Sequence, residues 1–148
     1  DIYIPDSIKL SNKSVQKEYL RALYDDEGSC SLRIFNKTKE WKRNVTLYSN
    51  SFVLLTQVKE LLLNRFGIST NTIFRNNKNS DYDKCFTLSM TGKENFIKFK
   101  RFIDFKVDYK SEMLEITIES YDNPFSLNRE GFEKIKNKLN KIKNKIKR

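Results

Sequence analysis

The stretch that decides the fold is Leu20-Arg21-Ala22-Leu23-Tyr24-Asp25-Asp26-Glu27-Gly28, in which a helical pattern ends in three consecutive carboxylates and a glycine. The apolar residues of this pattern recur at three- and four-residue spacings from Val15 onward, and Ser14 is a good N-cap. We therefore predict a helix over 14–26. Carboxylates at the C-terminal end of a helix oppose its dipole. From the residues alone, both a solvated acidic helix end and a metal site with oxygen ligands remain open.

The residues after this helix alternate between apolar and polar, which is the pattern of half-buried strands. We predict one strand over 29–36 and a second over 41–48, joined by a turn at 36–40 into a hairpin. The inward residues on these strands are Cys30, Leu32, Ile34, Val45 and Leu47.

The same order of helix and hairpin then repeats along the chain. We predict a helix over 51–66 that ends at Gly67, strands over 70–76 and 84–91 around a polar loop at 77–83, and helices over 93–103 and 111–121. The sequence thus predicts an α+β domain over 1–123, with a four-stranded antiparallel sheet and all helices on one face. A basic amphipathic helix would follow over 124–148.

Composition excludes several classes of site. The 148 residues contain no histidine, so Ser-His-Asp triads, Cys-His pairs and imidazole zinc sites are excluded. The two cysteines form no C-x-x-C pattern, and no apolar run approaches the length of a membrane span. We expect a cytoplasmic protein with no membrane partner and no small-molecule substrate. The first residue, Asp1, is not methionine, which suggests a processed or excised piece.

The formal net charge of +10 favours nucleic acid as the partner, although abundant lysine can also reflect an AT-rich genome. The outward face of the predicted sheet is polar and moderately basic, so it could lie in a DNA major groove. Arg33 is a candidate for reading guanine through two hydrogen bonds. On this face and at the hairpin tip, we expect DNA contacts from Ser31, Arg33, Phe35, Lys37, Lys42, Arg43, Asn44, Thr46, Tyr48, Arg75, Thr87 and Ser89.

The stretch 20–28, preceded by Glu18-Tyr19, resembles the LAGLIDADG motif of homing endonucleases. The predicted order of elements is similar to that family's αββαββα half-domain, and Thr91-Gly92-Lys93-Glu94-Asn95-Phe96 is similar to its second strand-to-helix junction. The lead-in Ile4-Pro5-Asp6-Ser7-Ile8 resembles that of archaeal and intein-type members. The resemblance covers roughly residues 4–121.

The resemblance implies roles for individual residues. Glu27 matches the carboxylate that binds Mg²⁺, and Gly28 matches the closing glycine beside the metal. A catalytic lysine is usual where Thr91 stands, which leaves Lys93 as the nearest substitute. Lys110 is similar to a lysine that contacts phosphate. Ser49 and Asn50 match positions that orient water near the metal, with helix capping as the alternative.

Two motif helices cross at small residues in this family, so the resemblance implies a dimer interface through the motif helix. The expected interface residues are Leu20, Ala22, Leu23 and Asp26. Asp26 replaces a residue that is usually small, and two Asp26 carboxylates across a symmetry axis would repel each other.

The resemblance implies a Mg²⁺-dependent endonuclease that cuts both strands of a long, near-palindromic DNA site as a homodimer. One alternative is a LAGLIDADG protein that has lost cleavage and acts as an intron maturase or a transcription regulator, which Asp26 and Thr91 favour. Another is the C-terminal half of a two-motif enzyme. A generic RNA-binding domain is disfavoured because no RNP-like aromatic pair or GXXG loop is present.

Overall fold

The computed structural model describes residues 2–76 and 85–147, so the polar loop predicted at 77–83 lies outside the described residues. The elements in chain order are α1 (Asp6–Lys9), α2 (Lys13–Glu27), β1 (Gly28–Phe35), β2 (Glu40–Ser49), α3 (Phe52–Phe66), β3 (Phe74–Arg75), β4 (Phe86–Met90), α4 (Lys93–Phe102), α5 (Asp108–Glu119), η1 (Ser120–Asp122) and α6 (Arg129–Ile146). No helix of the described ranges is long and apolar enough to cross a membrane.

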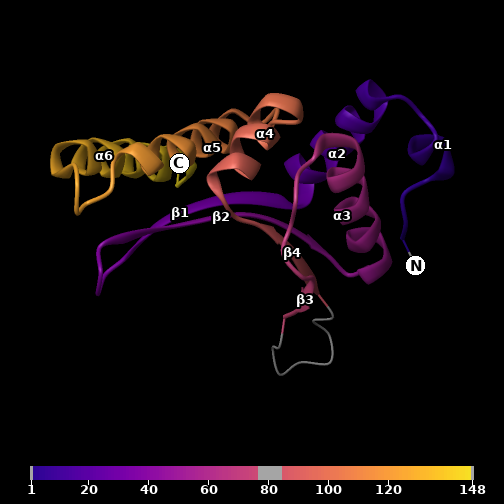
Figure 1. Ribbon diagram of the computed structural model, residues 1–148, viewed down its shortest axis with the longest axis horizontal. Coiled ribbons are helices and arrows are strands. Elements are labelled where there is room, and N and C mark those ends of the chain that lie inside the picture. Colours follow the sequence, from indigo (N-terminus) through magenta and orange to yellow (C-terminus); the bar gives the residue numbers. More distant parts are fainter. Residues whose placement is uncertain (1, 77–84, 148) are drawn as a thin grey trace.

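The four strands form one antiparallel sheet in the order β1-β2-β4-β3. Figure 1 shows α4, α5 and α6 along one side of β1 and β2, whereas no helix of the described chain covers the opposite side. The predicted α+β fold, with four antiparallel strands and one open sheet face, is confirmed. We call the uncovered side the open face.

Two local predictions differ from the structure. The cap of α2 is Asn12 rather than Ser14, because the Asn12 side chain accepts a hydrogen bond from the backbone amide of Val15 at 3.0 Å. Strand β3 is only Phe74–Arg75, although the flanking amides of Asn71 and Asn76 still donate to carbonyls of β4 and its lead-in.

Two apolar clusters fill the side of the sheet that the helices cover. The larger joins α2, α3 and α4 to β2 and β4, and its centre includes Leu20, Tyr24, Leu55, Leu88 and Phe99. The smaller joins the outer part of the β1–β2 hairpin to α5 and α6 through Leu32, Trp41, Met113, Ile116, Phe132, Ile135, Leu139 and Ile142. The apolar stripe of the C-terminal helix therefore packs onto the hairpin.

Candidate metal and nucleic-acid site

Helix α2 passes into β1 without a loop, so its last residue, Glu27, directly precedes the first strand residue, Gly28. The glycine is required by space, because a Cβ at position 28 would lie 2.5 Å from the carbonyl oxygen of Tyr24. Tyr24 cannot yield, since it is 1% exposed and its ring packs against Phe99 at 4.8 Å between centroids. Burial raises the pKa of the Tyr24 phenol far above its usual value. This close packing fixes where Glu27 leaves the helix.

Glu27 is exposed and lines a hollow of about 320 Å³. Tyr48, Ser49 and Asn50 line the same hollow, so the structure brings the two predicted water-orienting residues to Glu27. The residue that caps helix α3 is Ser51, rather than Ser49 or Asn50, because its hydroxyl accepts a hydrogen bond from the backbone amide of Leu54 at 3.1 Å. Within the described ranges, neither Glu27 nor Asp26 has a hydrogen-bond or ion-pair partner.

The oxygen atoms at this helix end suit a hard cation, because Mg²⁺ prefers carboxylate and carbonyl oxygens as ligands. No group of three or more acidic or thiol side chains that could hold a metal ion occurs among the described residues. Among the described residues, Glu27 alone would therefore be an incomplete ligand set. The predicted Gly28 ligand is less suitable, since its carbonyl oxygen already accepts a hydrogen bond from the Lys110 ammonium at 2.8 Å.

Lys110, which the resemblance relates to a lysine that contacts phosphate, binds the C-terminal end of α2. Its half-buried ammonium donates to the carbonyl oxygens of Asp25 at 2.6 Å and Gly28 at 2.8 Å. The negative end of the α2 dipole explains this placement, because the last carbonyls of a helix attract a cation. The phosphate contact of Lys110 stays a prediction, and the structure adds its two contacts with the end of α2.

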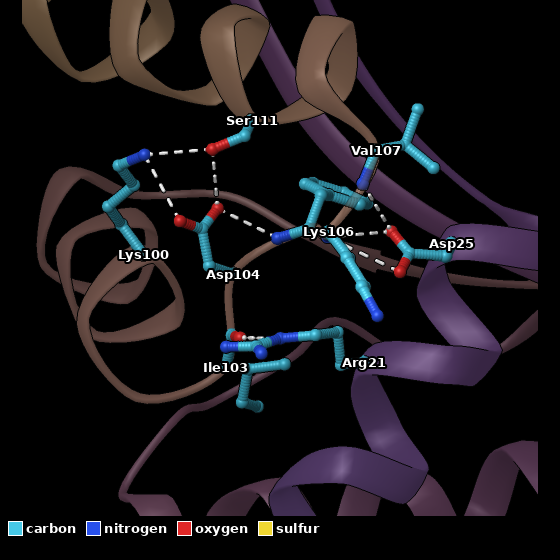
Figure 2. A network of polar contacts seen from close by, with 9 residues as sticks. Arg21, Asp25, Lys100, Ile103, Asp104, Lys106, Val107 and Ser111 are labelled. Carbon is cyan, nitrogen blue, oxygen red and sulfur yellow. Dashed lines mark hydrogen bonds and ion pairs between the residues drawn. The ribbon is translucent and has the colours of Figure 1, made fainter.

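The linker between α4 and α5 is held against α2 by its backbone (Figure 2). The Asp25 carboxylate accepts from the amide of Lys106 at 3.0 Å and from that of Val107 at 3.3 Å. The Arg21 guanidinium donates to the carbonyl oxygen of Ile103 at 2.8 Å. Together, these contacts place the linker beside the end of the helix that carries Glu27.

On the other side of this linker, Asp104 has a positive φ of 59°. Its carboxylate accepts from the Ser111 hydroxyl at 3.0 Å and from the Lys100 ammonium at 3.2 Å (Figure 2).

The linker carries an exposed lysine, Lys106, that sequence reasoning missed. No local pattern marks it, because the contact that places it joins residues 81 positions apart.

Lys93, the predicted catalytic lysine, has an acidic partner in the structure. Its ammonium pairs with Asp122 of η1 at 3.7 Å, and no hydrogen bond or ion pair in the described part of the chain joins it to Glu27. Lys106 is therefore the exposed lysine whose backbone is tied to the end of α2, and Lys93 is not.

The strand register places the predicted DNA-facing residues of β1, β2 and β4 on the open face, apart from Arg43. Ser31 is opposite Asn44, Arg33 is opposite Lys42, and Tyr48 is opposite Thr87. The exposed residues of the predicted DNA-contacting set are Arg33, Phe35, Lys42 and Tyr48 on β1 and β2, Arg75 on β3, and Lys37 in the turn between β1 and β2. They form a basic and aromatic surface along the sheet.

The hydroxyls expected on this face are mostly covered by neighbours. Thr46, Thr87 and Ser89 are 6%, 2% and 7% exposed. The Thr87 hydroxyl donates to the Asn76 side chain at 3.0 Å, and the Asn71 amide donates to the Ser89 hydroxyl at 3.2 Å. These hydroxyls therefore lie beneath the exposed surface.

A hollow of about 510 Å³ also opens on this face, lined by Asn44, Thr46, Tyr48, Phe74, Arg75, Asn76 and Thr87. The side-chain oxygen of Asn44 is buried here without a hydrogen-bond partner in the described part of the chain. Asn44 thus combines a partly buried side chain with an unused acceptor on the predicted DNA surface.

Arg43 lies on the helix side of the sheet, contrary to its predicted place at the hairpin tip. Its guanidinium donates to the Ser120 hydroxyl at 2.7 Å and lies 3.7 Å from the centre of the Tyr121 ring. Burial lowers the pKa of this guanidinium. Strand parity explains the placement, because Arg43 is opposite the inward-facing Leu32.

The predicted dimer residues divide between the core and the surface of α2. Leu20 is 0% exposed within the larger cluster, so it cannot reach a partner. Leu23 is half-buried, whereas Ala22 and Asp26 are exposed. Ala22 and Asp26 continue an exposed stripe of α2 that begins at Val15, at the spacing of one helix face.

A family model described as a LAGLIDADG-like domain matches residues 14–104. This chain belongs to the LAGLIDADG-like family. The match begins within α2 and ends in the linker that Asp25 and Arg21 hold.

Solved LAGLIDADG structures share the fold. An archaeal intron-encoded homing endonuclease complexed with DNA, I-Vdi141I, aligns with a TM-score of 0.65 and 13% identity over 90% of this chain and 85% of that chain. The LAGLIDADG homing endonuclease I-GzeII in complex with its DNA target aligns with a TM-score of 0.55 and 16% identity over 93% of this chain and 44% of that chain.

A curated relative comes from Thermococcus kodakarensis and is named probable translation initiation factor IF-2. It is 33% identical over 118 residues, which are 80% of this chain and 9% of that protein. This LAGLIDADG chain therefore spans only a small part of the relative that it matches.

Proposed function

We propose that this LAGLIDADG protein is a Mg²⁺-dependent, site-specific DNA endonuclease that cuts both strands as a homodimer. The observation that carries the proposal is Glu27, an exposed carboxylate without a protein partner in the described residues, at the end of the motif helix. Mg²⁺ held by this carboxylate would activate water and stabilise charge on the scissile phosphate. This chemistry requires no histidine.

One chain supplies one such carboxylate, so a double-strand cut requires two. Crossing of two α2 helices at Ala22, the small exposed residue of the stripe, would bring both Glu27 side chains to a common axis. Asp26 lies on the same stripe one turn further along, so the two Asp26 carboxylates would also approach each other and weaken the dimer.

The open face gives the expected size of the target. Strand β1 has eight residues, which span about 23 Å at roughly 3.3 Å per step. This length matches about seven base pairs at about 3.4 Å per pair. Two copies would thus cover about 14 base pairs or more, with the cuts near the centre of a near-palindrome.

The test is to incubate wild-type protein and Glu27→Gln with a randomised duplex library in Mg²⁺ and in Ca²⁺, and to recover bound and cut molecules separately. We expect double-strand cuts in Mg²⁺ for the wild type only, with binding in Ca²⁺ retained by both proteins. Cuts that persist in Glu27→Gln would refute the assignment of the carboxylate.

Specific binding without cuts would favour the second candidate, a LAGLIDADG binding protein that acts as a maturase or regulator. The observation in its favour is that Lys93 pairs with Asp122 at 3.7 Å and, in the described part of the chain, makes no hydrogen bond or ion pair with Glu27. Sedimentation of the same samples measures the assembly, and a monomer that neither binds nor cuts would contradict the homodimer.

A further inference from the structure

The end of α2 lacks the usual helix C-cap. Helices commonly end in a left-handed residue that satisfies the last carbonyls, but Gly28 is extended, with φ −98° and ψ 160°. Its amide donates to the carbonyl oxygen of Tyr24, which satisfies one of those carbonyls. The Lys110 ammonium takes a second, that of Asp25, and also the first carbonyl of the strand, that of Gly28. A side chain from α5 thus completes the end of the motif helix.

The two Lys110 contacts flank the residues that carry the free carboxylates. Asp26 and Glu27 lie between the two carbonyls that the ammonium binds. The third carboxylate of the motif, Asp25, is already occupied by the amides of Lys106 and Val107. The backbone is therefore fixed on both sides of Asp26 and Glu27, whose side chains remain unpaired in the described part of the protein.

We propose that Lys110 is a positioning residue for the metal-binding carboxylate, an inference that rests on the proposed endonuclease function. By holding the carbonyls of Asp25 and Gly28, the ammonium sets the direction in which Glu27 leaves the helix. It also occupies the Gly28 oxygen, so this backbone group is not available to a metal. Finally, it places a positive charge beside the site, which limits how tightly one chain binds a cation before DNA arrives.

Loss of Lys110 should lower the cleavage rate and raise the affinity for a cation, and these opposite changes distinguish a positioning residue from one that only stabilises the fold. Loss of the ammonium frees the peptide groups around Glu27, so the carboxylate is misdirected and cleavage falls. The same loss removes a repulsive charge and releases a carbonyl oxygen, so binding of a bare cation becomes tighter. A residue that only stabilised the fold would not tighten cation binding when it was removed.

The experiment compares Lys110→Met, Lys110→Gln and Lys110→Arg with the wild type in the full chain. Lys138→Met is the matched control, because this lysine pairs with Glu119 across α5 and α6 at 2.9 Å. Calorimetry first establishes that each variant folds, and Lys110→Gln replaces the methionine variant if the latter does not. Hydrogen exchange of the segment 25–29 and Tb³⁺ luminescence sensitised by Tyr48, which lines the Glu27 hollow, are then measured without DNA.

In the uncharged variants, we expect exchange in 25–29 to be about tenfold faster. We expect Tb³⁺ affinity to rise about fivefold, as screened repulsion over roughly 10 Å implies. Single-turnover cleavage should fall about 100-fold, with duplex affinity in Ca²⁺ unchanged. Lys110→Arg should retain wild-type Tb³⁺ affinity, and Lys138→Met should match the wild type throughout.

Unchanged exchange in 25–29, or weaker Tb³⁺ binding in Lys110→Met, would overturn the proposal. Both readouts are independent of cleavage, so they test Lys110 even if the wild-type protein cuts no DNA. In that case the endonuclease function fails while the positioning of Glu27 by Lys110 stands or falls separately. Loss of Tb³⁺ binding in Glu27→Gln confirms that the luminescence reports this carboxylate.

Discussion

Replacement of Gly28 by alanine should damage both stability and cleavage, because it introduces a methyl group where α2 meets β1. The new Cβ would lie 2.5 Å from the Tyr24 carbonyl oxygen, 2.8 Å from its Cα and 2.8 Å from its ring. The first two atoms are backbone, and the ring is held between Phe99 and Phe105. The strain must therefore move the helix end itself.

Overpacking of this kind costs about 2 kcal/mol, which lowers the melting temperature of a domain of this size by roughly 6 °C. A displacement of about 1 Å at Glu27 would reduce single-turnover cleavage about 100-fold. Calorimetry measures the first effect and cleavage of the selected duplex measures the second.

Gly67→Ala is the matched control, because Gly67 also ends a helix but has a left-handed φ of 66°. Its Cβ would meet only the Lys98 ammonium, at 3.6 Å, so the expected cost is the left-handed conformation, about 1 kcal/mol. Cleavage should survive in this variant. A Gly28→Ala protein that melts and cuts like the wild type would refute the argument that space fixes Glu27.

Three further predictions concern other parts of the molecule. Asp26→Ala should stabilise the homodimer by about 1 to 3 kcal/mol, which is the Coulomb energy of two like charges about 6 Å apart. Sedimentation measures the dimer affinity, and an unchanged affinity would place Asp26 outside the interface. Phe132→Ala should lower the free energy of unfolding by about 3 kcal/mol. Its ring lies 4.8 Å from that of Trp41 between centroids, so hydrogen exchange should accelerate more at Trp41 than in α3. Equal acceleration at both places would contradict a separate hairpin cluster. Burial raises the pKa of the Cys30 thiol to about 11, so its thiolate is scarce at neutral pH. Alkylation at pH 7 should therefore favour Cys85, and the rate at Cys30 should increase as the pH rises. Equal labelling of the two cysteines at pH 7 would refute this expected preference.

Alternation and helical spacing were enough to predict the sheet and the helices that cover it. The same parity that placed Asn44 and Tyr48 on the open face also assigns Arg43 to the helix side, so its error was avoidable. The family resemblance placed Leu20 in the interface, whereas the structure buries it completely in the core.

The contacts around Glu27 could not be predicted from sequence. Lys110 lies 82 positions from Gly28, and the Asp25 contact with Lys106 spans 81 positions. Such contacts depend on how the α4–α5 linker crosses α2, which no local periodicity encodes. The local pattern did indicate that such contacts are needed, because three carboxylates at a helix C-terminus require a compensating cation or amide donors.

The two ends of β1 are fixed by different kinds of interaction, and this difference bears on function. At Gly28, polar contacts from Lys110 and the close approach of Tyr24 set the direction of one carboxylate. Toward the hairpin, the apolar cluster around Trp41 and Phe132 holds the strands from behind and leaves the open face free. A strand anchored at both ends acts as a rigid spacer between the proposed cutting residue and the proposed DNA-contacting residues. Under the proposed function, variation on the open face would change the target sequence without moving Glu27, because none of the described open-face side chains takes part in either anchor.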